Sequence, residues 1–223
     1  MNLDVVQILY QYIAFLFAIS VHESAHAWMA NRCGDPTARM LGRITLNPIK
    51  HIDPIGTVLV PAIAWLTGLR FLIGWAKPTP VDPRHFKNPV RDDILTSLAG
   101  PISNLLVASC AVAGLAILSL SSPLGRALVH GYAVETGSVL VPVVVLLKTF
   151  LLINVILAAF NIIPIPPLDG SHVLRHFLPE SMRRAYDMIG MFGLLLLFVV
   201  GTRLLNFLAA PILYFFQAIL ERV

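Results

Sequence analysis

Residues 7–29 read QILYQYIAFLFAISVHESAHAWM, an apolar stretch that carries two histidines and a glutamate near its C-terminal end. A helix needs about 20 residues to cross a hydrocarbon layer of about 30 Å, so this stretch is long enough. It has no basic segment before it and no small-residue cleavage site, so we do not expect it to be removed as a signal peptide. The sequence therefore predicts that residues 7–29 form a permanent membrane-spanning helix.

The composition of the whole chain is that of a membrane protein. Of its 223 residues, 57% are hydrophobic and 13% are charged, and the mean hydropathy is +0.79. Such a chain has too few charges to cover a soluble globule of this size. The formal charge of +4 comes from basic residues in short stretches between apolar segments, as in cytoplasmic loops, so we predict no nucleic-acid site.

Further apolar stretches predict the rest of the architecture. Residues 94–120 and 138–163 are each long enough to span the bilayer. The block 188–220 is interrupted at Gly201, Thr202 and Arg203, which favours a helical hairpin over one long bent helix. We expect an all-α polytopic membrane protein whose single domain, residues 1–223, contains a three-helix catalytic core at about 7–175, a re-entrant segment that could include β-strands, and C-terminal membrane helices at about 188–220.

The distribution of basic residues predicts the topology. The first 31 residues contain no lysine or arginine, which places the N-terminus outside. The apolar block 55–76 is followed by several basic residues before Asp93, and a full crossing would move them to the outer face. We therefore expect this block to enter the membrane and return on the cytoplasmic side.

The two histidines and the glutamate have the spacing of a zinc site. His22 and His26 are four residues apart, so both imidazoles project from one face of a helix with 3.6 residues per turn. Neutral imidazole binds zinc well, and Glu23 could take a proton from water that the metal makes acidic. The alternative is a helix end at the headgroup level, but three ionisable groups inside a span are costly and favour a function.

A third ligand is expected where the apolar stretch 138–163 ends. The chain there reads NIIPIPPLDG at residues 161–170, and its prolines prevent the helix from continuing. Catalytic zinc uses three protein ligands and an open fourth position, and Asp169 is the best remaining candidate. Its alternative role is to cap a helix that begins at Ser171. The two cysteines are too few for a thiolate cluster.

These motifs resemble those of the site-2 protease family of intramembrane zinc metalloproteases, in a short form without a PDZ or nucleotide-sensing domain. The resemblance covers about residues 15–175. The family elements H-E-x-x-H, A-G-P-x-x-N and N-x-x-P…L-D-G match, in order, His22–His26, Ala99–Asn104 and Asn161–Gly170. Residues 74–81, GWAKPTPV, are similar to a family loop that precedes the middle element.

The resemblance implies a zinc-dependent endopeptidase that hydrolyses peptide bonds in or near the transmembrane segments of its substrates. His22, His26 and Asp169 would bind one Zn²⁺ ion, and Glu23 would activate water. Asn161 would help to stabilise the oxyanion that forms on the scissile carbonyl. The expected partners are single-span membrane proteins and the lipid bilayer, and the expected location is a prokaryotic cell (inner) membrane with the active site near its cytoplasmic side.

A substrate helix must unwind before cleavage, and an extended segment could add to an exposed strand edge. Candidate edges are residues 38–46 and 75–81, and the candidate substrate-binding residues are Trp75, Lys77 and Pro78. Asn104 follows small residues at a helix start, so we expect it to join helices rather than to act in catalysis.

Two other functions remain as alternatives: a catalytically silent zinc-binding membrane protein and a zinc transporter. A transporter would not need Glu23 between the two histidines, nor Asn161. The sequence predicts neither the natural substrate nor the oligomeric state.

Overall fold

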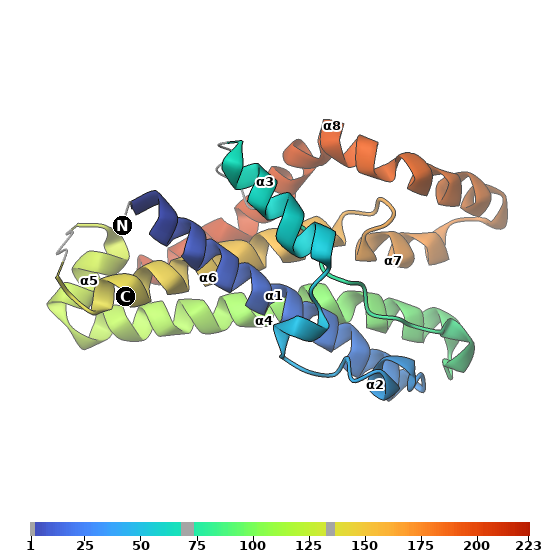
Figure 1. The fold of residues 1–223 in the computed structure, drawn as a ribbon, viewed down its shortest axis with the longest axis horizontal. Helices are drawn as coiled ribbons and strands as arrows, with labels where there is room; N and C mark the ends of the chain where they lie inside the picture. The colour runs from blue at the N-terminus through green and yellow to red at the C-terminus, as the bar shows by residue number, and fades with distance from the viewer. Residues whose placement is uncertain (1–2, 68–73, 133–136) are drawn as a thin grey trace.

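The computed structural model describes residues 3–67, 74–132 and 137–223. Helices account for most of the described chain (Figure 1). In chain order they are α1 (Leu3–Cys33), α2 (Thr37–Met40), the 3₁₀ turn η1 (Pro48–Lys50), the π-helical turn η2 (Pro54–Leu59), α3 (Val60–Leu66), the 3₁₀ turn η3 (Pro83–His85), α4 (Pro89–Ser121), α5 (Pro123–His130), α6 (Leu140–Ile162), α7 (Asp169–Phe177) and α8 (Glu180–Leu220).

Three long helices form the centre of the molecule. Helix α4 packs against both α1 and α6 and runs in the opposite direction to both (Figure 1). Small buried side chains lie in these helices, among them Ala18, Ala108 and Ala158. Lipid tails are as apolar as leucine, so helices in a bilayer associate through close packing, which small residues allow.

Among the residues that the structure describes, four helices are long and apolar enough to cross a membrane. They are Val5–Cys33, Pro89–Ser121, Leu140–Ile162 and the Arg203–Leu220 part of α8. The predicted spans 7–29, 94–120 and 138–163 are therefore confirmed as long apolar helices. The protein is an integral, all-α polytopic membrane protein.

The ends of α4 and α6 follow from their sequences. Asn88 caps α4 by accepting a hydrogen bond from the Arg91 amide, and Pro89 occupies the first turn, where a missing N–H costs nothing. Helix α6 ends at Ile162, two residues before Pro164, as the proline run predicted. The chain then turns and begins α7 at Asp169, so the broken segment brings this aspartate back towards α1 and α4.

The predicted C-terminal hairpin is wrong. Gly201, Thr202 and Arg203 lie inside α8, which is one continuous helix of 41 residues. Figure 1 shows that this helix changes direction along its length. Each of the three residues has a backbone N–H, so the helical hydrogen bonds can continue through them.

The re-entrant segment was expected to allow β-strands, but the part of the chain that the structure describes contains no strand. Residues 37–40 of the first candidate edge are helical, and residues 75–81 are extended without a strand partner. In the apolar block 55–76, η2 and α3 together are about 20 Å long, shorter than the hydrocarbon layer. Residues 68–73 of this block lie outside the described chain, and its re-entrant course stays a prediction.

Candidate metal centre

The two histidines of α1 point at each other. His22 Nε2 and His26 Nε2 are 3.0 Å apart, and both side chains are buried. The separation of four residues on one helix creates this pair, as the sequence predicted.

Asp169 completes a group of three. Its Oδ2 lies 3.1 Å from His22 Nε2 and 3.4 Å from His26 Nε2. These separations are close to the value of about 3.3 Å between neighbouring ligand atoms in a tetrahedral site with zinc bonds of about 2 Å. The structure thus brings together the three residues that the sequence predicted as zinc ligands.

The hydrogen bonds behind the histidines determine which ring nitrogens carry protons. His26 Nδ1 lies 2.7 Å from the Thr96 carbonyl, which can only accept, so Nδ1 donates and the Nε2 of the neutral ring carries a lone pair. His22 Nδ1 lies 2.6 Å from Asn104 Oδ1. The Asn104 amide nitrogen donates to Ala18 and to Asn154, so its oxygen is the atom that faces His22.

Three electron-pair donors therefore converge without a proton between them. The Asp169 Oδ2 is buried and has no hydrogen-bond partner within the described residues. A buried carboxylate oxygen without a donor is costly. A cation between the three atoms would satisfy all of them, and two imidazoles with one carboxylate form a donor set that suits Zn²⁺.

Asn104 was expected to join helices, and the structure shows which helices it joins. Its fully buried carboxamide connects α4 to α1 through Ala18 and to α6 through Asn154, and it also orients the ring of His22. Such outer hydrogen bonds tune a metal ligand. Sequence reasoning missed this second role because Asn104 lies 82 positions from His22.

Gly100 makes room for the two imidazoles. A Cβ atom built on Gly100 would lie 2.4 Å from His26 Nε2 and 2.6 Å from His22 Cε1. No side chain fits there without moving a ring, so the small residue of the A-G-P-x-x-N element is required by the site itself.

Glu23, the predicted catalytic base, is not part of the ligand group. Its Oε2 accepts a hydrogen bond of 2.7 Å from the Thr79 amide, and its backbone carbonyl accepts one of 2.9 Å from the Thr79 hydroxyl. Asn161 lies at the last turn of α6, and its amide nitrogen donates to the Leu157 carbonyl one turn back. The structure pairs neither side chain with His22, His26 or Asp169, the candidate zinc ligands.

The predicted substrate-binding residues lie in an extended segment beside Glu23, which we call the strap (residues 75–82). Trp75 is half exposed, and its amide donates to the Gly56 carbonyl. The Lys77 amide donates to the His51 carbonyl, and the carbonyls of Lys77 and Pro78 accept from Arg43. The backbone of the strap is thus already bonded to the protein along one edge.

The remaining histidines differ in their surroundings. His51 is fully buried, and its Nε2 contacts the Thr45 carbonyl. Burial lowers the pKa of His51, and the positive charge of Arg43 acts in the same direction. His176 of α7 pairs with Asp93 at 2.7 Å, which docks α7 on α4. The complete burial of His51 had no signal in the sequence.

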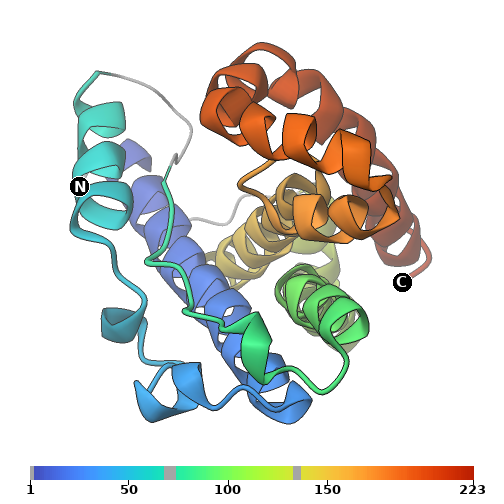
Figure 2. The same ribbon diagram turned by 90° about the vertical axis from the view of Figure 1, so that its right-hand side faces the viewer.

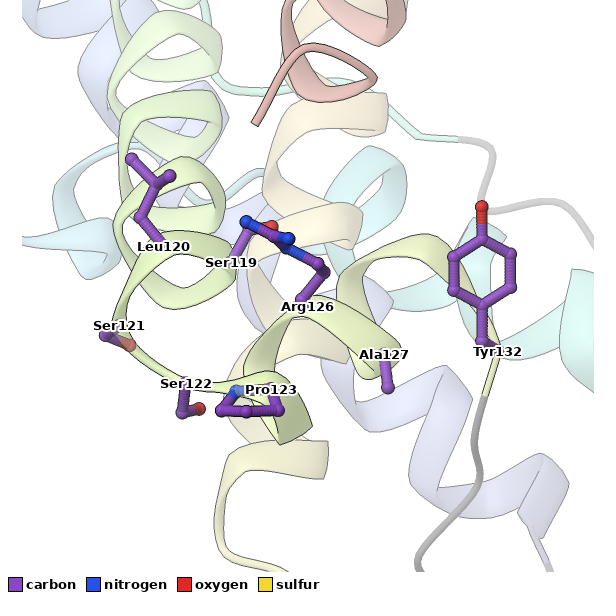
Figure 3. Close-up of a pocket in the computed structure, with 8 residues that line it drawn as sticks. All are labelled: Ser119, Leu120, Ser121, Ser122, Pro123, Arg126, Ala127 and Tyr132. Carbon is purple, nitrogen blue, oxygen red and sulfur yellow. The ribbon is translucent and has the colours of Figure 1, made fainter.

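A surface hollow of about 440 Å³ lies elsewhere on the molecule (Figure 3). It is lined by Ser119, Leu120, Ser121, Ser122, Pro123, Arg126, Ala127 and Tyr132. Ser119 is fifteen residues beyond Asn104 on α4, a distance of about 22 Å along a helix. The hollow contains none of the predicted site residues.

Comparison with known proteins agrees with this geometry. The sequence profile of peptidase family M50 matches residues 10–200. A Bacillus subtilis (strain 168) protein named "Putative zinc metalloprotease YwhC" is 34% identical over 191 residues, covering 86% of this chain and 79% of the relative. A Mycolicibacterium smegmatis protein named "Putative zinc metalloprotease Rip2" is 31% identical over 172 residues, covering 76% of this chain and 58% of the relative. No solved structure matches the chain significantly.

The chain therefore belongs to peptidase family M50, the family of the site-2 proteases that the sequence motifs resemble. It is a zinc metalloprotease of the lipid bilayer, and Zn²⁺ is the metal of its family.

Proposed function

We propose that this metalloprotease is an intramembrane endopeptidase that cleaves single-span membrane proteins in or near their transmembrane segments. One observation carries the proposal. The lone pairs of His22, His26 and Asp169 converge between helices that are long enough to cross a bilayer. Ionisable groups are expensive at such a depth, and an arrangement that suits zinc accounts for their presence.

The residues of the site have separate roles in peptide hydrolysis. His22, His26 and Asp169 would hold Zn²⁺, and the bound ion would supply a Lewis acid for activating water near neutral pH and for polarising a carbonyl. Asn104 and the Thr96 carbonyl hold the two imidazoles in the tautomer that binds a metal.

Glu23 serves as the general base. Thr79 occupies its Oε2, which leaves Oε1 to accept the proton that water loses as it attacks the carbonyl carbon. The same carboxyl group then gives this proton to the nitrogen of the leaving amine as the C–N bond breaks. No covalent intermediate with the protein is needed.

Asn161 supports the oxyanion. One N–H of its amide donates to Leu157, and an amide nitrogen has a second hydrogen for the developing negative charge. The strap is the substrate platform, with Trp75, Lys77 and Pro78 nearest to the extended substrate. The half-exposed Trp75 ring supplies apolar contact area there.

The proposed orientation follows the charge pattern. Both chain ends lie at one end of the bundle (Figure 1), and α2 and α7 lie at the other end, which faces the viewer in Figure 2. Asp169 is the first residue of α7. Arg32, Arg39, Arg43 and Arg175 belong to the same end as α2 and α7, so we place this end in the cytoplasm of a prokaryotic cell. The 223 residues act as one catalytic domain.

The test uses purified protein in liposomes together with a single-span membrane protein. Glu23→Gln should abolish cleavage and leave the zinc content and the thermal unfolding temperature unchanged, because Glu23 is a base and not a ligand. The exposed carboxylate of Glu221, at the end of α8, provides the matched control, Glu221→Gln, which should cleave normally. Cleavage by the Glu23→Gln protein at the normal rate would refute the proposal.

A further inference from the structure

Closely spaced residues of the strap form hydrogen bonds with the rest of the protein. The Thr57 hydroxyl donates to the Trp75 carbonyl at 2.7 Å. The Lys77 amide donates to the His51 carbonyl at 2.8 Å, and the Asp82 amide donates to Asp35 at 2.7 Å. An extended segment without a strand partner thus obtains its hydrogen bonds from side chains and turns.

Arg43 makes the central attachment. Its side chain is 5% exposed, and its guanidinium donates to the carbonyls of Lys77 and Pro78 in the strap and of Lys50 in the turn η1. A planar guanidinium with donors on both terminal nitrogens can hold two backbone segments in one fixed geometry, whereas a lysine ammonium cannot.

The next residue after this attachment contacts the catalytic base. Thr79 follows Pro78 directly, and its amide donates to the Glu23 carboxylate at 2.7 Å. Burial lowers the pKa of Arg43, and the negative charge of Glu23 acts in the opposite direction, in favour of the cation. Arg43, the strap and Glu23 therefore form one connected unit, in which the position of Arg43 sets the position of the Thr79 amide.

We propose that Arg43 is a positioning residue for the general base: it anchors the strap at Lys77 and Pro78 so that the Thr79 amide holds the Glu23 carboxylate in place. This inference rests on the proposed role of Glu23 in peptide hydrolysis. A base that has lost its fixed donor samples other rotamers, so the chemical step slows while metal binding is unaffected.

Kinetics in liposomes provide the first test. Arg43→Ala should lower kcat at least tenfold, with a smaller change in KM and with unchanged zinc content. Ethylguanidinium should restore part of the activity by filling the site of the lost side chain, and ethylammonium should not. Arg43→Lys keeps the positive charge, but its kcat should still be lowered nearly as much as that of Arg43→Ala. The matched control is Arg84→Ala, which removes an arginine whose side chain is 88% exposed and which lies two residues beyond the strap, in η3.

Two outcomes would overturn the inference. One is a normal kcat for Arg43→Ala. The other is a pattern that marks a residue needed only for folding. In that pattern, Arg43→Ala loses zinc together with its activity, and ethylguanidinium does not restore the activity. Arg43→Lys then loses activity as well, and its unfolding temperature is lowered.

Hydrogen exchange gives a readout that needs no activity. Pro78 and Pro80 have no amide hydrogen, so a peptide covering residues 78–80 reports on the Thr79 amide alone. Exchange at Thr79 should speed up at least tenfold in both Arg43→Ala and Glu23→Ala and stay unchanged in Arg84→Ala. Unchanged exchange in Arg43→Ala would refute the inference even if Glu23 is the base. If exchange at Thr79 is faster in Arg43→Ala but the unmodified protein cleaves no substrate, only the proposed function is refuted.

Discussion

The Asn104 oxygen on α4 lies 2.6 Å from the Nδ1 of His22 on α1, and this contact connects the packing of the helices to the metal centre. The carboxamide accepts from the imidazole with its oxygen and donates to α1 and α6 with its nitrogen. One buried side chain thus links three helices and orients the ring of His22, a proposed zinc ligand.

This contact predicts that Asn104→Ala weakens zinc binding by roughly ten- to a hundredfold, because the orientation of His22 is lost. The affinity is measured by competition with a chelator in detergent solution. Ser109→Ala, which removes an exposed hydroxyl from the same helix, should bind zinc normally. Normal zinc affinity in Asn104→Ala would mean that the helix contacts alone hold the ring.

Gly100 should tolerate no side chain. Gly100→Ala places a methyl group 2.4 Å from His26 Nε2, so one imidazole must move and zinc should be lost from most of the protein. Gly114→Ala on the same helix meets only the end of Leu147, at 3.2 Å, and should keep its zinc. Metal analysis of the two purified variants compares them directly, and equal zinc contents would contradict the prediction.

Asn161→Ala should lower turnover by roughly ten- to a thousandfold, the range expected when one oxyanion donor is removed. Its zinc content should stay normal, in contrast to Asn104→Ala. Turnover and metal content are measured on the same preparations. If Asn161→Ala loses zinc and Asn104→Ala loses only turnover, the roles of the two amides are reversed.

The topology can be tested with single cysteines in a background that lacks Cys33 and Cys110. Lys87 precedes α4 and Arg126 lies in α5, beyond its other end. Helix α4 is long and apolar enough to cross the membrane. If residues 55–76 return to the cytoplasmic side, a cysteine at Lys87 should react with an impermeant thiol reagent only from the cytoplasmic face, and a cysteine at Arg126 only from the outer face. Labelling of the cysteine at Lys87 from outside would refute the re-entrant course of residues 55–76.

The burial of His51 predicts a pH dependence of stability. The pKa of His51 is lowered in the folded state by burial. Below a pH of about 6.5, the histidine is therefore protonated more readily in the unfolded chain than in the folded protein. This contribution to stability is complete above that pH and is lost as the pH falls below it. The unfolding temperature should therefore drop on acidification, and it should drop less in His51→Gln. Equal drops in the two proteins would assign the effect to other groups.

Local features of the sequence determined the membrane spans and half of the metal site. The spans follow from the length and hydropathy of apolar stretches, and the bilayer leaves a helix as the only structure that satisfies their backbone. The pairing of His22 with His26 follows from the pitch of one helix. The prolines after Asn161 likewise determined where α6 ends. The polar interruption at 201–203 misled the prediction because glycine, threonine and arginine can each continue a helix.

Only the tertiary structure decided which distant residues serve the site. Asp169 reaches the histidines because α6 ends and the chain turns back, and Asn104 reaches His22 because α4 packs beside α1. The contact of Thr79 with Glu23 spans 56 positions in the chain. Periodicity describes neighbours within one helix or strand, whereas such pairings depend on how whole helices and loops pack, which no local pattern in this sequence records.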